Sequence, residues 1–245
     1  MARLFVEPAR LREEIVVATG EDHRYLTRVL RLSIGDSVVL FDGVDEEADA
    51  TILRIGPRAL EMRVTVRRAA AAPSGPQITL IQSLTKAAKF DWIVQKATEL
   101  GVSRIIPTIS MRAIPRVDAM STLGRRARWQ KIAREAARQS GRIDVPEVEP
   151  VTAFHTAIAA APKDGLSLIL WEGARQQGLR GALPIPAPNR ITVAVGPEGG
   201  FSAAEIDDAK AQNFIPVGLG ARILRTETAP IALLAIVGFA VGDLG

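Results

Sequence analysis

The sequence predicts an α/β protein in two parts, a small N-terminal β-rich barrel and a larger α/β domain. Three observations support this. Short apolar runs separated by turn residues fill the first 70 residues, which is typical of a barrel. From residue 76 onward, apolar strands alternate with helical segments, which is typical of a parallel sheet. Between them, residues 69–76 (AAAAPSGP) have the composition of a linker. We therefore place the domains at residues 1–70 and 76–245.

The barrel is predicted from alternating runs whose ends carry glycine or aspartate. The expected strands lie at 3–6, 37–41, 48–55 and 59–66. Their turns contain Gly35, Gly43 and Gly56. One segment, residues 21–32 (EDHRYLTRVLRL), instead has the spacing of a helix, with apolar residues on one side and arginines on the other.

The larger domain is predicted from strand and helix signals that follow one another in order. Strands are expected at 77–83, 103–109, 166–171, 190–195 and 214–219, and helices at 89–101, 122–139, 202–212 and 229–241. The strands 166–171 and 190–195 are continuously apolar, as in a sheet covered on both faces. Ser202 and Glu205 match the capping box S-x-x-E, so a helix should begin there.

The composition of the 245 residues excludes several classes of protein. The longest apolar run, 229–241, contains Pro and Gly and is too short for a bilayer, so we expect a buried helix and no membrane association. The charged N-terminus does not resemble a signal peptide, which favours a cytoplasmic protein. The absence of cysteine excludes disulfides, thiolate zinc sites and cysteine nucleophiles. No metal-ligand cluster is visible, so we expect no metal.

The basic charge is concentrated in the middle of the chain. Residues 76–150 hold 13 Lys/Arg against 7 Asp/Glu, whereas the first 75 residues hold 11 against 12 and the last 95 hold 7 against 8. On the predicted helix 122–139, Leu123, Trp129 and Ala133 share one side, while Arg128 and Arg134 share the other. Such a surface favours contact with nucleic acid. A solvated basic face without a partner is the alternative.

A glycine-rich turn follows the strand 190–195. Residues 196–200 (GPEGG) stand where open α/β sheets bind ligands. Neither a P-loop nor a dinucleotide fingerprint occurs in the chain, and Glu198 would repel a phosphate. The turn therefore favours a neutral or cationic ligand held by backbone groups, although a purely structural turn is equally consistent with this pattern.

A second loop has the same position in the pattern. Residues 219–230 (LGARILRTETAP) leave a strand and enter a helix, with Thr226 or Thr228 as candidate N-cap and Pro230 in the first turn. The two loops would converge on one pocket if their strands are neighbours.

These two segments resemble the signature motifs of the RsmE family of SPOUT methyltransferases. The resemblance extends over almost the whole chain. The stretches KAAKFDWIVQKATELGVSRIIP, RWQKIAREAARQSGR and DHRYLTRVLRL are similar to further blocks of that family, in the same order and spacing.

The resemblance implies a fold, a reaction and partners. The fold would be a PUA-like N-terminal barrel followed by an α/β domain with a C-terminal trefoil knot. The protein would act as a cytoplasmic homodimer that methylates N3 of a uridine in 16S rRNA, within the small ribosomal subunit, using S-adenosylmethionine. The residues implied in cofactor binding are Leu170, Gly196, Glu198, Gly199, Gly200, Leu219, Gly220, Ile223, Leu224, Arg225, Thr226 and Thr228.

The sequence leaves the catalytic roles open. Glu227 is a candidate proton acceptor, but at the start of a helix it could instead act as a cap. Arg225 could stabilise negative charge on the uracil or bind a phosphate. Trp92 and Trp129 have the spacing of core residues, whereas Trp171 ends a central strand near the expected pocket.

RNA contact is expected from both domains. The candidate residues are Arg3, Arg10, Arg24, Arg28, Arg31, Arg112, Arg116, Arg125, Arg126, Arg128, Lys131, Arg138 and Arg142. Two other readings remain: an RNA-binding assembly factor without methyltransferase activity, and a related enzyme with a different target, such as a ribose hydroxyl or transfer RNA.

Overall fold

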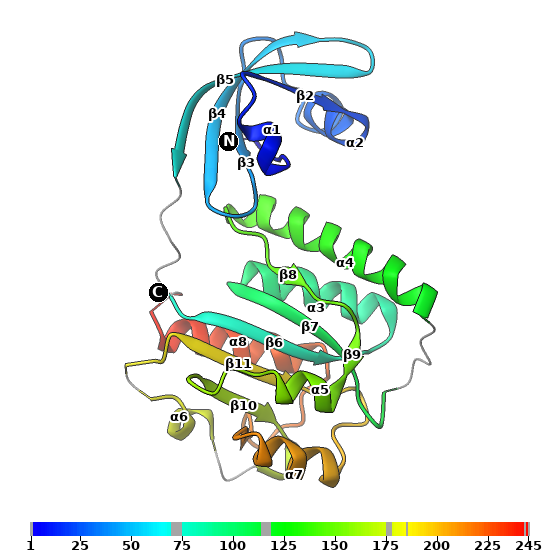
Figure 1. Cartoon of the computed structure of the whole chain (residues 1–245), viewed down its shortest axis with the longest axis vertical. Coiled ribbons are helices and arrows are strands. Elements are labelled where there is room, and N and C mark those ends of the chain that lie inside the picture. The colour runs from blue at the N-terminus through cyan, green and yellow to red at the C-terminus, as the bar shows by residue number, and fades with distance from the viewer. Residues whose placement is uncertain are drawn as a thin grey trace. The chain divides into compact units, whose positions relative to one another are not determined.

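The computed structural model describes residues 2–69, 75–113, 119–174, 178–184, 186–242 and 244. The chain forms two compact units, which we describe separately: unit 1 is Met1–Ala72 with Ala137–Val145, and unit 2 is Pro73–Ala136 with Pro146–Gly245. The α/β class predicted from the sequence is confirmed (Figure 1). The sequence did not anticipate that residues 137–145 group with the first unit. The domain boundaries and the trefoil knot stay predictions.

Unit 1 is built on a five-stranded sheet in the order β1-β3-β4-β5-β2. Its elements are β1 (Ala2–Phe5), α1 (Pro8–Leu11), β2 (Ile15–Thr19), α2 (Gly20–Arg24), a π-helix (Tyr25–Val29), β3 (Ser37–Phe41), β4 (Glu46–Ile55) and β5 (Ala59–Ala69). Strand β2 and helix α1 were not predicted. Residues alternate between buried and more exposed along much of β4, and Leu11, Leu26, Leu40 and Leu60 fill the core behind the sheet.

Unit 2 contains a sheet in the order β12-β10-β11-β6-β7-β8, with β9 paired to β7, and its described strand pairs are parallel. The strands are β6 (Gln77–Ser83), β7 (Val102–Ile109), β8 (Glu147–Val148), β9 (Thr152–Ala153), β10 (Leu166–Leu170), β11 (Arg190–Val195) and β12 (Ile215–Val217). Strand β11 is buried from Ile191 to Val195 because helices cover both faces of the sheet.

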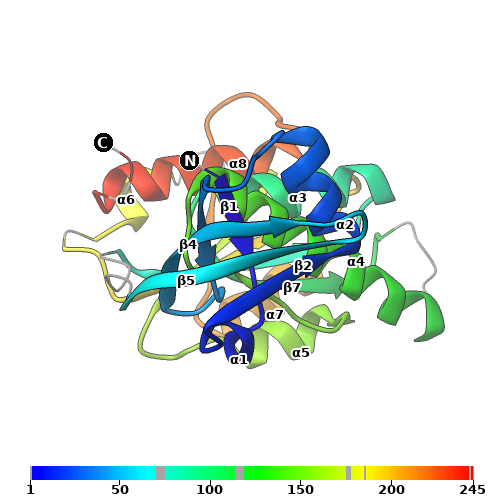
Figure 2. The same cartoon turned by 90° about the horizontal axis from the view of Figure 1, so that it is seen from above.

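Helices α3 (Ala87–Glu99) and α8 (Thr228–Ala240) cover one face of this sheet, and α5 (Phe154–Ala159) and α7 (Ala203–Ala211) cover the other (Figure 2). The remaining helices are α4 (Ala119–Ser140), α6 (Leu179–Ala182) and a 3-10 turn (Glu172–Ala174). Trp129 of α4 is buried and its ring lies 4.3 Å from that of Phe90 in α3. In the described residues, no helix is long and apolar enough to cross a membrane.

One expectation about an apolar side chain was wrong, and a second side chain is more exposed than its neighbours on the same helical side. Trp92 of α3 is 41% exposed, so it is not a core residue. Leu123 of α4 is 70% exposed, although it shares a helical side with the buried Trp129 and Ala133. Helical periodicity predicts which residues share a side, but whether that side is covered along its whole length depends on the neighbouring elements.

Candidate active site

A cavity of about 420 Å³ opens at the carboxyl edge of the parallel sheet in unit 2. Its wall is formed by residues that follow three adjacent strands, β11, β10 and β12. The lining residues are Lys89, Leu170, Trp171, Glu172, Val195, Gly196, Pro197, Glu198, Gly200, Phe201, Val217, Gly218, Leu219, Gly220, Ala221, Arg222, Ile223, Leu224, Arg225, Thr226 and Ala229. The volume lies in the range of small-molecule sites.

The first wall segment is the turn that leaves β11. The Gly200 N–H donates to the Pro197 carbonyl at 2.9 Å, and Gly200 has φ of +67°, which a side chain would strain. A Cβ at Gly196 would lie 3.3 Å from Gly200 C and from the Phe201 backbone nitrogen and ring, so only glycine fits without displacement. The predicted capping box is present: Ser202 and Glu205 bond reciprocally and start α7 at once.

The second wall segment runs from β12 into α8, and it is tied to the first. The Thr226 hydroxyl, in a residue only 8% exposed, donates to the Gly196 carbonyl at 2.8 Å. The expectation that Thr226 or Thr228 caps α8 was therefore wrong, because the N-cap position belongs to Glu227. The Glu227 side chain makes no capping bond either. Pro230 does lie in the first turn and is buried.

The two loops converge although their strands are not neighbours. Strand β10 lies between β11 and β12, and its exit adds Leu170, Trp171 and Glu172 to the cavity wall. The sequence predicted the strand that ends near Trp171, but it did not predict that this strand lies between the two strands that precede the motif loops.

The cavity wall includes all of the predicted cofactor residues except Gly199 and Thr228. Gly199 lies against Arg112 instead: a Cβ there would be 3.2 Å from the Arg112 Cβ, and the Gly199 carbonyl accepts from the Arg112 guanidinium at 3.0 Å. Thr228 is the exposed first residue of α8.

Lys89 is a site residue that the sequence analysis missed. Its ammonium, on the first turn of α3, lies 3.4 Å from Glu198 Oε1 and 3.0 Å from Glu227 Oε2. The sequence places no lysine in either loop, yet the fold brings one to both. The lysine stands more than 100 residues from these loops in the chain, so no local spacing signal could have found it.

This ion pair biases both groups toward their charged forms. Hydrogen bonding to Glu227 raises the pKa of Lys89 despite some desolvation. For Glu227, partial burial works against ionisation, but a bond from its own backbone N–H and the charge of Lys89 outweigh it, so its pKa is lowered. A lowered pKa makes Glu227 a weak proton acceptor near neutral pH.

The predicted RNA-contact residues of unit 1 fall into two groups. Arg24, Arg28 and Arg31 are exposed, although Arg24 also donates to the Gly20 carbonyl at 3.3 Å. Arg3, Arg10, Arg138 and Arg142 bond within the unit: Arg3 to Glu47 and the Arg142 carbonyl, Arg10 to the Val17 carbonyl, and Arg142 to Asp144. The Arg138 guanidinium stacks on Tyr25, 3.7 Å from the ring centre.

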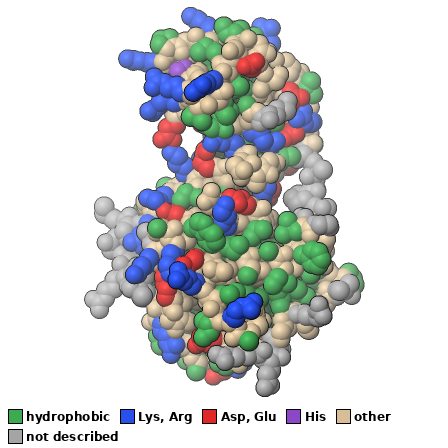
Figure 3. Space-filling model, turned by 180° about the vertical axis from the view of Figure 1, so that it is seen from behind, with side chains coloured by type: hydrophobic (Ala, Val, Ile, Leu, Met, Phe, Trp, Pro, Cys, Tyr) green, Lys and Arg blue, Asp and Glu red, His purple; other side chains and the backbone are tan. Residues whose placement is uncertain are grey.

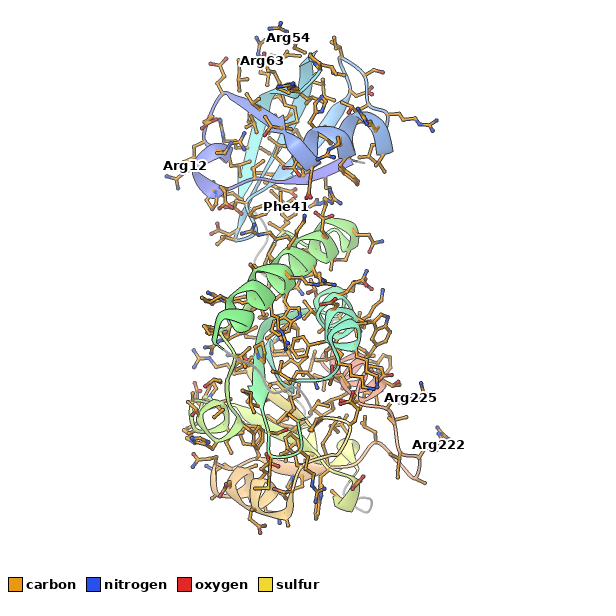
Figure 4. All side chains as sticks on the ribbon, turned by 90° about the vertical axis from the view of Figure 1, so that its right-hand side faces the viewer. Arg12, Phe41, Arg54, Arg63, Arg222 and Arg225 are labelled. Atoms are coloured by element: carbon orange, nitrogen blue, oxygen red, sulfur yellow. The ribbon has the colours of Figure 1, made fainter. Side chains whose placement is uncertain are left out.

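In unit 2, Lys131 is exposed. Arg128 is exposed but pairs with Asp91 of α3. Arg112 holds the glycine turn, as described above, and Arg116 lies outside the described residues. Arg222 and Arg225 line the cavity, and the ends of their side chains extend outward from the loop (Figure 4). Arg222 was not among the predicted residues, although it belongs to the same segment.

Comparison with known proteins places this geometry in a family. Residues 73–238 match the RNA methyltransferase domain, and residues 18–65 match the RNA methyltransferase PUA domain. The chain is 30% identical to ribosomal RNA small subunit methyltransferase E of Bacillus subtilis, over 98% of this chain and 96% of that one. It is 34% identical to the Synechocystis protein of the same name, over 95% of this chain and 76% of that one.

Solved structures agree with these matches. Ribosomal RNA small subunit methyltransferase E from Neisseria gonorrhoeae, bound to S-adenosylmethionine, has a TM-score of 0.88 and 34% identity over 98% of both chains. A Legionella pneumophila protein solved with the same cofactor has a TM-score of 0.88 and 30% identity over 97% of both chains. The chain therefore belongs to the RNA methyltransferase family whose members include the ribosomal RNA small subunit methyltransferases E.

Proposed function

We propose that this protein transfers the methyl group of S-adenosylmethionine to N3 of a uridine in 16S rRNA. The observation that carries the proposal is the cavity built by the GPEGG turn and the segment 219–226 at the carboxyl edge of the sheet. Two relatives of similar fold were solved with this cofactor. Target base and position follow from the resemblance of the motifs.

The residues of the cavity fit this cofactor chemically. The two loops supply backbone groups and glycines that allow close approach. Glu198 places a carboxylate in the wall, which suits a ligand carrying a sulfonium cation. We assign cofactor contact to the lining residues among those predicted, and we assign none to Gly199 and Thr228, which do not line the cavity. The cofactor supplies an electrophilic methyl group bound to positive sulfur.

The protein has to position N3 for in-line displacement. The bond from the methyl carbon to sulfur breaks, the N3–methyl bond forms, and the N3 proton leaves to water. Arg225 stands at the rim with its side chain directed outward (Figure 4), where its charge can stabilise the uracil as that proton leaves. The lowered pKa of Glu227 favours a role as a permanent carboxylate over that of proton acceptor.

The substrate RNA is proposed to contact both units through phosphates. Arg24 and Arg31 in unit 1, and Arg128 and Lys131 in unit 2, are exposed and can give salt-dependent affinity. The other candidates already make contacts within their own units, which we propose as their main role: Arg3, Arg10, Arg112, Arg138 and Arg142. We propose the assembled small subunit in the cytoplasm as the preferred substrate.

A homodimer is proposed from an apolar face on unit 2. Trp92 of α3 and Ile236 and Phe239 of α8 are 41%, 45% and 74% exposed. Figure 3 views the side that carries these two helices and shows hydrophobic side chains gathered there. Substituting Phe239→Ser should shift the sedimentation equilibrium toward monomer. Ile34→Ser, at an exposed position of unit 1, is the matched control; equal masses for both variants would count against this face.

The reaction itself is tested by incubating the protein with labelled S-adenosylmethionine and small subunits that lack the native modification. Label in 3-methyluridine is expected. Label in another nucleoside would overturn the target and keep the reaction class. RNA binding without any transfer or cofactor binding would favour the assembly-factor reading.

A further inference from the structure

The ion-pair cluster of Lys89, Glu198 and Glu227 links three separate elements of unit 2. Lys89 comes from α3, Glu198 from the turn after β11, and Glu227 from the start of α8. The three side chains are 32%, 23% and 19% exposed. One cation therefore pairs with a glutamate of the GPEGG turn and with a glutamate at the end of the second loop.

Lys89 and Glu198 line the cavity, whereas Glu227 does not. The ammonium lies closer to Glu227, at 3.0 Å, than to Glu198, at 3.4 Å. Glu227 thus anchors the lysine, and the anchored lysine holds the Glu198 carboxylate in the wall. The bond within the GPEGG turn joins the Gly200 N–H to the Pro197 carbonyl, so it fixes the backbone of the turn, whereas the Glu198 carboxylate pairs with the lysine.

We propose that Lys89 is a positioning residue that holds the Glu198 carboxylate toward the positive charge of the methyl donor. This inference rests on the proposed function. Glu198 then distinguishes the cationic donor from the demethylated product, whose sulfur is neutral and whose shape is otherwise nearly the same. Charge at this one atom is the main chemical difference between the two molecules, so a fixed carboxylate is a means of binding the donor and releasing the product.

A role in the fold alone makes a different prediction from a role in positioning charge. If Lys89 only stabilised the loops, removing it would weaken binding of donor and product equally, because both use the same backbone contacts. If it positions Glu198, donor binding falls further than product binding. The ratio of the two dissociation constants is therefore the informative quantity.

The test compares Lys89→Met, Lys89→Arg and the control Lys96→Met by isothermal titration with S-adenosylmethionine and S-adenosylhomocysteine. Lys96 lies on the same helix and pairs with Glu99 at 2.8 Å, away from the cavity. In Lys89→Met we expect donor affinity to fall about tenfold, the order of one charge-assisted hydrogen bond, and product affinity to fall by a clearly smaller factor. Lys89→Arg should restore most of the discrimination, and Lys96→Met should match the unmodified protein.

Glu198→Gln tests the same inference from the other side of the ion pair and leaves the Lys89–Glu227 pair in place; it serves if Lys89→Met does not fold. It removes the charge and keeps the size of the side chain, so it too should reduce the preference for the donor. Unchanged discrimination in either variant, or equal loss of both ligands, overturns the inference. Failure of the unmodified protein to bind the donor at all would instead overturn the proposed function.

Discussion

The hydrogen bond from Thr226 to Gly196 leads to the most direct test of how the cavity is held. It joins the two loops at 2.8 Å, and Thr226 is 8% exposed. Replacing Thr226 with valine keeps the branched shape and removes only the hydroxyl, which leaves the Gly196 carbonyl without its partner. An unpaired buried acceptor costs about 1–3 kcal/mol. Since Gly196 is only partly buried and water can reach it, we expect about 1–2 kcal/mol.

Two measurements should register this loss. For a chain of this size, about 1 kcal/mol lowers the midpoint of thermal unfolding by roughly 2–4 °C. If the same energy is lost from the alignment of the loops, the dissociation constant for S-adenosylmethionine rises by about 5- to 30-fold. Differential scanning calorimetry and isothermal titration measure the two effects independently.

Thr228→Val is the matched control, because Thr228 is exposed, makes no cavity contact and lies two residues away. It should melt and bind as the unmodified protein does. Thr226→Ser retains the hydroxyl and should recover most of the affinity. If Thr226→Val behaves like Thr228→Val in both assays, the bond between the loops does not hold the cavity, and the prediction is wrong.

Three further predictions concern stability. Ser202→Ala removes half of the capping box of α7 and should lower the free energy of unfolding by about 1 kcal/mol, measured by urea denaturation; Ser140→Ala, at the end of α4, should have a smaller effect. Phe90→Ala removes a ring that is 0% exposed and contacts Trp129, and should lower the free energy of unfolding by about 3–5 kcal/mol. A decrease below about 1 kcal/mol in the same assay would show that this ring is not packed in the core. Finally, the pKa of Glu227 in the folded protein lies below the ordinary 4.5. Its ionised side chain therefore contributes to the free energy of unfolding above pH 4.5, and this contribution is lost as the pH falls through the pKa of the folded state. The difference in free energy of unfolding between the unmodified protein and Glu227→Gln should stay constant from about pH 7 to about pH 5 and become smaller at lower pH. A difference that grows on acidification would show that the pKa of Glu227 is not lowered on folding.

The sequence alone was sufficient to predict features that depend on neighbouring residues: strand bounds, a helix cap and the two loop motifs. Strands at 77–83 and 190–195 form with the predicted bounds, because each is a short segment rich in β-branched residues and bounded by turn residues. The capping box at Ser202 is likewise a local arrangement of side chain and backbone, complete within four residues. The motif segments in the two loops were recognisable for the same reason.

Only the tertiary structure decided which distant groups meet. Strand β10 lies between the two strands that precede the motif loops, Thr226 bonds to Gly196 and does not cap its helix, and Lys89 stands between two glutamates of different loops. A periodic pattern records which side of an element is apolar, since that is a property of neighbouring residues. The order of strands in a sheet and the partner of a long side chain depend on how whole elements pack, and contacts between residues far apart leave no spacing in the chain from which they can be read.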